Sequence, residues 1–191
     1  MTATEFVTRV IETLERLAIP YMTVGSFSSN VYGQPRSTKD ADFVIQLGNR
    51  SISSIAAEIG SDFELDPQMS FETVTATTRH RLKHRDTAFM VEFFLLSDDP
   101  HDQSRFRRRL ARTIGERQAL VPTAEDVIIT KLRWSKQGHR QKDIDDVRNV
   151  LGIQLTSLDI PYIRSWCDQH GTRELFEKLL LENQRFNAEH P

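Results

Sequence analysis

The chain has 191 residues, of which 38% are hydrophobic and 27% charged, and its formal net charge is −2, which is ordinary for a globular protein. No apolar run approaches the roughly 20 residues that cross a bilayer. The single cysteine, Cys167, excludes an internal disulfide and a cysteine-based zinc cluster, and we expect it to be a small buried hydrophobe. Residues 1–17 lack the pattern of a signal peptide, so we expect a cytoplasmic protein.

The first half of the chain alternates between helical and strand patterns. Apolar residues at helical spacing predict an amphipathic helix over residues 4–18, and a short β-prone stretch at 21–24 stops at Gly25. A short helix is expected next, with Ser26 as its N-cap and Gly33 as its stop. The remaining expected elements are a strand at 42–47, a helix at 51–60, a half-buried strand at 70–78, a charged turn at 83–87 and a central strand at 87–96.

The second half becomes helical. We expect a basic helix over 102–112, a strand over 114–122, a helix opened by Thr123, a helix over 141–152 ended by Gly152, a terminal helix pair over 158–171 and 172–186, and a loose tail over 187–191. The pattern predicts an α/β (α+β) fold in which helices flank a twisted mixed sheet. The expected domains are an α/β core over residues 1–122 and a C-terminal helical segment over 123–191 that packs on it.

Two carboxylates open one predicted strand. Asp40 and Asp42 point to the same face, because side chains two residues apart in a strand do so. Like charges this close repel unless a cation lies between them, and Mg²⁺ favours a few carboxylates together with substrate phosphates. Glu92 is a lone charge in an apolar strand and could be a third ligand, although an edge glutamate that reaches solvent is the alternative. Two metal ions held in this way would suit phosphoryl transfer.

Small and basic residues precede the aspartates. Gly25 lets the backbone approach a phosphate closely, and the helix that follows offers free N–H groups. Ser26 and Ser29 can add hydroxyl donors. Arg36 and Lys39 flank the aspartates and could pair with phosphate charge.

These residues carry a family resemblance. Gly25-Ser26, then thirteen residues, then Asp40-Ala41-Asp42 is similar to the signature of polymerase-β-like nucleotidyltransferases. The string "PRSTKDAD" resembles the minimal branch, which includes AbiEii-like toxin enzymes and small aminoglycoside or lincosamide nucleotidyltransferases. The segment at 122–151 resembles the helical part of AbiEii-like families. The resemblance spans about residues 20–152.

The resemblance implies roles for the residues of the α/β core. It implies Asp40, Asp42 and Glu92 as ligands of Mg²⁺ or Mn²⁺, and Gly25 and Ser26 as holders of the triphosphate of an NTP. The third acidic residue of the family is more often aspartate, and this chain has glutamate there. The longer side chain can still reach a metal ion.

The resemblance also implies roles in the helical segment. Lys131 would be a phosphate-facing cation, and Lys142, Asp143 and Asp146 would line the cleft, with Asp146 orienting Lys131 or a substrate group. A solvated helix lysine is the alternative for Lys131. The acidic run at 143–146 could instead be a capping cluster that pairs with Lys142 and Arg148.

The predicted reaction is Mg²⁺-dependent transfer of a nucleoside monophosphate from an NTP to an acceptor, with release of pyrophosphate. RNA or tRNA is somewhat favoured as acceptor by the basic stretches at 79–85 and 104–112, and a small molecule or a protein is the alternative. A toxin–antitoxin or abortive-infection enzyme would have an antitoxin protein as partner. A catalytically inactive module that binds a nucleotide or a protein is the hypothesis from a different class.

Overall fold

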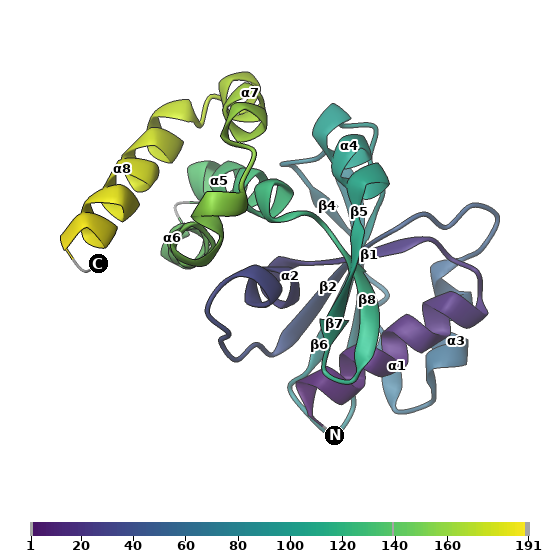
Figure 1. Cartoon of the computed structure of the whole chain (residues 1–191). Helices are drawn as coiled ribbons and strands as arrows, with labels where there is room; N and C mark the ends of the chain where they lie inside the picture. Colours follow the sequence, from purple (N-terminus) through teal and green to yellow (C-terminus); the bar gives the residue numbers. More distant parts are fainter. Residues whose placement is uncertain (1, 139, 190–191) are drawn as a thin grey trace. The chain divides into compact units, whose positions relative to one another are not determined.

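The protein is represented by a computed structural model that describes residues 2–138 and 140–189 and contains two compact units (Figure 1). The sheet unit comprises the residues up to Ser28 together with Arg36–Pro122. The helical unit comprises Ser29–Pro35 and the residues from Thr123 onward. The boundary between them therefore falls inside α2 (Gly25–Tyr32).

A mixed sheet forms the centre of the sheet unit. Its strand order is β1-β2-β6-β5-β3, and β4 pairs with β5. β2 and β6 run parallel, and the other neighbouring pairs are antiparallel, so the expected mixed sheet is confirmed. The strands are β1 (Tyr21–Val24), β2 (Asp40–Ile45), β3 (Phe63–Leu65), β4 (Ser70–Glu72), β5 (Thr77–His84) and β6 (Met90–Leu95).

Two helices cover one face of this sheet. α1 (Ala3–Arg16) and α3 (Ile52–Ile59) lie side by side on it (Figure 1). α1 opens with a capping box, in which Thr2 and Glu5 each satisfy the other's backbone N–H. The ring of Phe6 on α1 stacks on Phe89 with ring centroids 4.6 Å apart. Burial of such aromatic rings stabilises this side of the sheet.

The strand predicted over 70–78 is wrong in extent. The chain turns at residues 73–76, so that β4 is short, and β5 continues through the basic residues to His84. Glu72 holds the turn, because its carboxylate accepts hydrogen bonds from Thr75 N at 2.9 Å and Thr75 Oγ1 at 2.7 Å. Alternation of polar and apolar residues marked the strand character but not this internal turn. The charged residues at 83–84 belong to β5, and the turn begins at residue 85.

The helix predicted over 102–112 is also wrong at its C-terminal end. α4 (Pro100–Arg108) ends at Arg108, and the next residues form β7 (Leu110–Ile114). β7 pairs with β8 (Arg117–Val121) across a two-residue turn in which Gly115 has a φ of +62°. The strand expected over 114–122 is therefore the second half of a hairpin. Arginines at helical spacing suggested a longer helix, and the pairing of the two strands overrides that preference.

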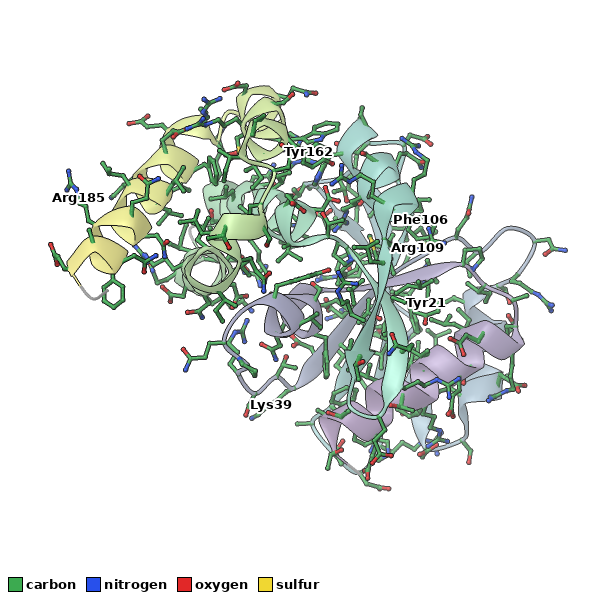
Figure 2. The ribbon with its side chains drawn as sticks, viewed as in Figure 1. Tyr21, Lys39, Phe106, Arg109, Tyr162 and Arg185 are labelled. Carbon is green, nitrogen blue, oxygen red and sulfur yellow. The ribbon has the colours of Figure 1, made fainter. Side chains whose placement is uncertain are left out.

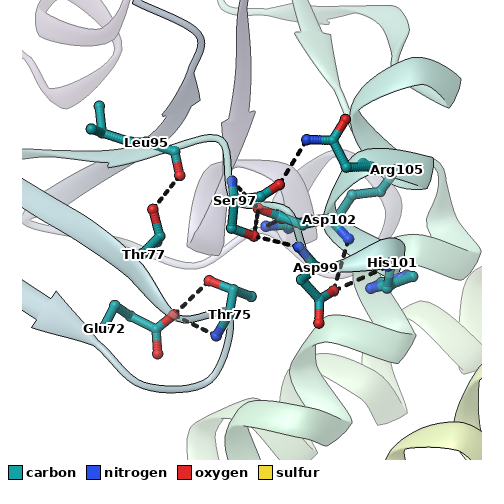
Figure 3. A network of polar contacts seen from close by, with 10 residues as sticks. Glu72, Thr75, Thr77, Leu95, Ser97, Asp99, His101, Asp102 and Arg105 are labelled. Atoms are coloured by element: carbon teal, nitrogen blue, oxygen red, sulfur yellow. Dashed lines mark hydrogen bonds and ion pairs between the residues drawn. The ribbon is translucent and has the colours of Figure 1, made fainter.

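A polar network fixes the end of β6 to the start of α4 (Figure 3). Asp102 is buried and accepts hydrogen bonds from Ser97 Oγ at 2.8 Å and from Arg105 Nε at 2.6 Å. Asp99 caps α4 by accepting from the backbone of His101 and Asp102, each at 3.0 Å. Burial alone would raise the pKa of the Asp102 carboxyl, but the charge and hydrogen bond of Arg105 and the bonds from Ser97 lower that pKa overall.

The helical unit contains the expected helices. They are α5 (Ala124–Gly138), α6 (Gln141–Gln154), the short η1 (Leu155–Ser157), α7 (Ile160–His170) and α8 (Arg173–Glu189). Tyr162 on α7 donates a 2.8 Å hydrogen bond to the buried Asp126 on α5. Cys167 is fully buried, as expected of a small hydrophobe. No helix in residues 2–138 and 140–189 has the length and hydropathy of a membrane span.

Two predicted boundaries in the helical unit are wrong. α6 runs two residues past Gly152, because a glycine within a helix is tolerated where the surrounding contacts hold it. Residues 187–189 belong to α8 rather than to a loose tail, and residues 190–191 lie outside the described residues. α2 begins at Gly25, so Ser26 is its second residue and not its N-cap.

Candidate active site

Three carboxylates lie on one face of the sheet unit. The parallel register pairs Asp42 on β2 with Glu92 on β6, so these two side chains point to the same side. Asp40 joins them because it lies two residues before Asp42. All three are half-buried. The opposite face carries Phe43 and Phe93, which are fully buried.

Gly25 lies against the carboxylate of Asp42. A β-carbon placed on Gly25 would be 1.9 Å from Oδ2 of Asp42, and the residue has a φ of +63°. Both observations favour glycine, because the β-carbon of another residue would displace the Asp42 carboxylate and its backbone would be strained in the left-handed region. The end of β1 is thereby brought against the acidic side chains of β2.

Thr38 braces the first aspartate. Its Oγ1 donates to a carboxylate oxygen of Asp40 and lies 3.1 Å from the Asp40 carbonyl oxygen. The backbone N–H of Met90 donates to the carbonyl of Lys39 at 3.0 Å, which extends the contact between β2 and β6. Lys39 itself is exposed directly before β2 (Figure 2). The threonine of "PRSTKDAD" therefore positions a candidate metal ligand.

Arg36 and Ser26 are brought together. Nη2 of Arg36 donates a 2.9 Å hydrogen bond to Oγ of Ser26, which is buried in the first turn of α2. In the same turn, Ser28 Oγ donates to the Gly25 carbonyl at 2.9 Å. The sequence predicts that Ser26 and Arg36 bind the phosphates of a nucleotide. The structure shows that these two residues contact one another.

Glu92 has a cationic neighbour that the sequence reasoning missed. Nη1 of Arg79 on β5 lies 3.4 Å from Oε2 of Glu92, and Nε of Arg79 donates to Ser70 Oγ at 2.9 Å. Arg79 points to the carboxylate face because β5 pairs it with Phe94 on β6, two residues beyond Glu92. The alternation of basic residues at 79, 81 and 83 is a sequence signal that these side chains share one face of a strand. It could predict the contact with Glu92 only if the start of β5 were known.

The carboxylates fit a divalent cation in donor chemistry. Within the described residues, no three His, Cys, Asp or Glu side chains are gathered closely enough to enclose a metal ion. Mg²⁺ does not need such a cage, because it is commonly held by one or two carboxylates while water and substrate phosphates fill its other positions. Asp40 and Asp42 supply this minimum on one face. Glu92 is the additional oxygen donor on the same face, although Arg79 contacts it.

A buried ion cluster lies within the helical unit. Nζ of Lys131 on α5 is 3.0 Å from Oδ1 of Asp143 and 2.7 Å from Oδ2 of Asp146, both on α6. Ser29 donates to the same Asp146 oxygen at 3.3 Å. Lys131 is 8% exposed and the two aspartates are 2% and 3% exposed. Lys131 is therefore not a solvated surface lysine, and its charge already has two partners.

The remaining residues of the acidic run on α6 behave differently. Asp145 is exposed and pairs with Arg148 at 3.2 Å, as expected for a surface pair. Lys142 is exposed and does not join the cluster of Lys131. Asp145 faces solvent and fits the interpretation as a surface pair, whereas Asp143 and Asp146 face α5. That Asp143 and Asp146 line a cleft stays a prediction.

Comparisons with known proteins identify the fold. Neither protein-family models nor curated proteins give a match. The solved structure of ANT(2″)-Ia in complex with adenylyl-2″-tobramycin matches with a TM-score of 0.63 at 12% identity, over 90% of this chain and 98% of that one. An antigenic nucleotidyltransferase-like protein from Paracoccidioides brasiliensis matches with a TM-score of 0.58 at 17% identity, over 94% of each chain. The lincosamide antibiotic adenylyltransferase LnuA, bound to lincomycin, gives 0.51 at 11% identity, over 80% and 98%.

At these identities the similarity concerns the fold. The chain has the mixed α/β fold seen in these nucleotidyltransferases, as the Gly-Ser and Asp-x-Asp pattern predicted. Its assignment to the AbiEii-like branch stays a prediction.

Proposed function

We propose that the protein transfers a nucleoside monophosphate from an NTP to an acceptor hydroxyl. The observation that carries this proposal is the register of β2 and β6, which pairs Asp42 with Glu92 on the face that also bears Asp40. Gly25 against Asp42 adds a close backbone approach at the same place. The nucleotidyltransferase fold supports this reading of the carboxylates.

Asp40 and Asp42 would hold Mg²⁺ or Mn²⁺, with Glu92 as a further ligand. When bound, the metal ion supplies positive charge that offsets the negative charge of the triphosphate. Thr38 orients Asp40, and the turn at Gly25 keeps room beside Asp42. Ser26 and Arg36 offer a hydroxyl and a guanidinium to phosphate oxygens.

In this reaction the acceptor oxygen attacks the α-phosphorus of the NTP. The new O–P bond forms as the bond from the α-phosphorus to the bridging oxygen breaks, and pyrophosphate leaves. The acceptor proton passes to a base, and Glu92 is the carboxylate we assign to this role. The role of Lys131 as a phosphate-contacting cation stays a prediction. Asp143 and Asp146 already balance its charge, which does not favour this role.

Two observations bear on the acceptor. Several basic residues that favoured RNA are paired within the chain: Arg79 with Glu92, Arg81 with Asp66 and Arg105 with Asp102. Two of the similar structures carry a tobramycin adduct and lincomycin. Both observations favour a small molecule that bears a hydroxyl group over RNA.

The deciding experiment uses NTPs labelled at the α-phosphate, Mg²⁺ and total cell extract. We expect label to appear in one acceptor fraction, which we expect to be small molecules rather than RNA or protein. The double variant Asp40→Ala and Asp42→Ala should abolish the transfer, while Asp86→Ala, an exposed carboxylate in the turn after β5, should not.

The competing function is a module that binds a nucleotide or a protein partner, such as an antitoxin, without catalysis. The internal partners of Glu92 and Lys131 favour it, because both charges are already satisfied. Such a module would label no fraction with any NTP, and NTP binding would survive the Asp40→Ala and Asp42→Ala changes.

A further inference from the structure

The helical unit contains a pocket that is separate from the carboxylates of the sheet unit in its residue composition. Its volume is about 510 Å³, which lies in the range of small-molecule sites. Its lining comes from the end of α5, the start of α6 and the start of α8. Every lining residue belongs to the helical unit.

Positive charge dominates the lining. Lys136, Arg140 and Lys178 line the pocket, and Glu174 is its acidic lining residue. Lys136 donates to the His170 carbonyl at 3.1 Å, which leaves its charge without a carboxylate at that contact. Arg140 lies 3.3 Å from Oδ2 of Asp143, a carboxylate that it shares with Lys131.

Of the three cations, Lys178 is the most available to a ligand. It is exposed on α8, and among residues 2–138 and 140–189 it forms no hydrogen bond or ion pair, even with Glu174 one turn earlier. A lysine without a partner at the wall of a pocket is available to an anionic ligand.

Two helix N-termini reach the same pocket. Arg140 and Gln141 line it at the start of α6, which has no side-chain cap. Thr172 lines it at the start of α8 and is 2% exposed. The Thr172 hydroxyl lies beside the Cys167 thiol and has no oxygen or nitrogen partner within the described residues. Free N–H groups and the positive end of each helix dipole favour a bound anion.

The pocket also has an apolar side. Ile144 on α6 and Leu175 on α8 line it and are half-buried. We propose that this pocket binds a phosphate-bearing small molecule, with the phosphate between Lys136, Arg140 and Lys178 and any organic part against Ile144 and Leu175. This site does not depend on the proposed nucleotidyl transfer.

Trp134 provides a local fluorescence signal for ligand binding in this pocket. The Arg140 guanidinium lies 5.3 Å from the centre of the Trp134 ring, and the chain has only one other tryptophan, Trp166. The full chain, free of divalent metal, is titrated with inorganic pyrophosphate, with AMP and with sulfate while tryptophan fluorescence is recorded. We expect a saturable change with a phosphate compound, and we expect Trp134→Phe to remove it.

The decisive variant is Lys178→Glu, and Arg185→Glu is its matched control. Arg185 lies on the same helix, projects from α8 and is not part of the pocket (Figure 2). We expect Lys178→Glu to weaken binding about tenfold and Arg185→Glu to leave it unchanged. Circular dichroism verifies that both variants fold, and Lys178→Ala provides a milder second variant. Tighter binding of AMP assigns a nucleotide-like ligand, and tighter binding of pyrophosphate assigns an inorganic one.

Several outcomes overturn the proposal. These are no saturation below about 10 mM with either phosphate compound, equal binding of sulfate, or equal weakening by Lys178→Glu and Arg185→Glu. Loss of the signal in the variant Asp40→Ala and Asp42→Ala would place the ligand at the carboxylates instead. Because these measurements use no NTP turnover, their failure would leave the proposed transfer activity unaffected.

Discussion

Asp42 and Gly25 are in such close contact that a single β-carbon cannot fit between them: it would lie 1.9 Å from Oδ2 of the aspartate. The contact joins the end of β1 to the acidic face of β2. It favours glycine at this position, and it makes the position sensitive for the geometry of the carboxylates.

Gly25→Ala should impair transfer more than folding. The positive φ alone costs about 1–2 kcal/mol in a residue other than glycine. The clash also displaces the Asp42 carboxylate, and a displacement of about 1 Å at a reacting centre can cost about a hundredfold in rate. The measurements are the free energy of unfolding and the rate of nucleotidyl transfer.

Gly48→Ala is the matched control. Gly48 has a φ of +58°, but a β-carbon there meets no atom within 4 Å. It should therefore lose stability through the backbone alone and retain its rate. Equal loss of rate in both variants would contradict the role assigned to the contact between Gly25 and Asp42.

Local sequence patterns predicted part of this site. Alternation in a strand was enough to place Asp40 and Asp42 on one face, and an isolated charge in an apolar strand was enough to select Glu92. The pairing of Asp42 with Glu92 could not be predicted in this way, because it depends on the register between strands that are 50 residues apart. That the two side chains share a face follows only once β2 and β6 are known to be neighbours in this register.

Arg79 and Lys131 show which contacts local sequence patterns cannot predict. Arg79 was assigned to a basic stretch, and its contact with Glu92 depends on β5 starting at Thr77 rather than earlier. The apolar neighbours of Lys131 did not determine its face on α5, and only the packing of α6 against α5 shows that it meets two aspartates. Both are contacts between elements, which short-range spacing does not encode.

Arg79→Gln should lower the Mg²⁺ concentration that gives half-maximal transfer. Arg79 competes with a metal ion for Glu92, and a partly exposed ion pair is worth up to about 1 kcal/mol, or about fivefold in an equilibrium constant. Lys83→Gln is the control, because Lys83 lies on the same strand and face but contacts Asp66 at 3.8 Å. A higher Mg²⁺ requirement for Arg79→Gln would contradict the competition.

Lys131→Met should destabilise the helical unit by about 3–5 kcal/mol. The change leaves the carboxylates of Asp143 and Asp146 buried without their shared ammonium. Trp134 and Trp166 both belong to this unit, so fluorescence during urea unfolding follows it directly.

Arg148→Met is the comparison for the Lys131 variant. Its side chain is 43% exposed and pairs with Asp145 and Glu182, so its loss should cost less than about 1 kcal/mol. If Lys131→Met cost no more than this surface change, the cluster would not hold α5 against α6.

Asp102→Asn should remove part of the acid sensitivity of the sheet unit. The folded chain lowers the pKa of Asp102 below its ordinary value of 3.8, so the unfolded chain binds more protons between the two values. The stabilisation is therefore complete above pH 3.8 and is lost as the pH falls through the folded pKa. At pH 7 we expect Asp102→Asn to cost about 2–3 kcal/mol through its charged hydrogen bonds, and this cost should shrink below pH 3.8. Urea unfolding from pH 2 to pH 7 measures it, with the exposed neighbour Asp98→Asn as control. A cost for Asp102→Asn that stayed constant over this range would show that the charge of Asp102 is not what stabilises the junction of β6 and α4.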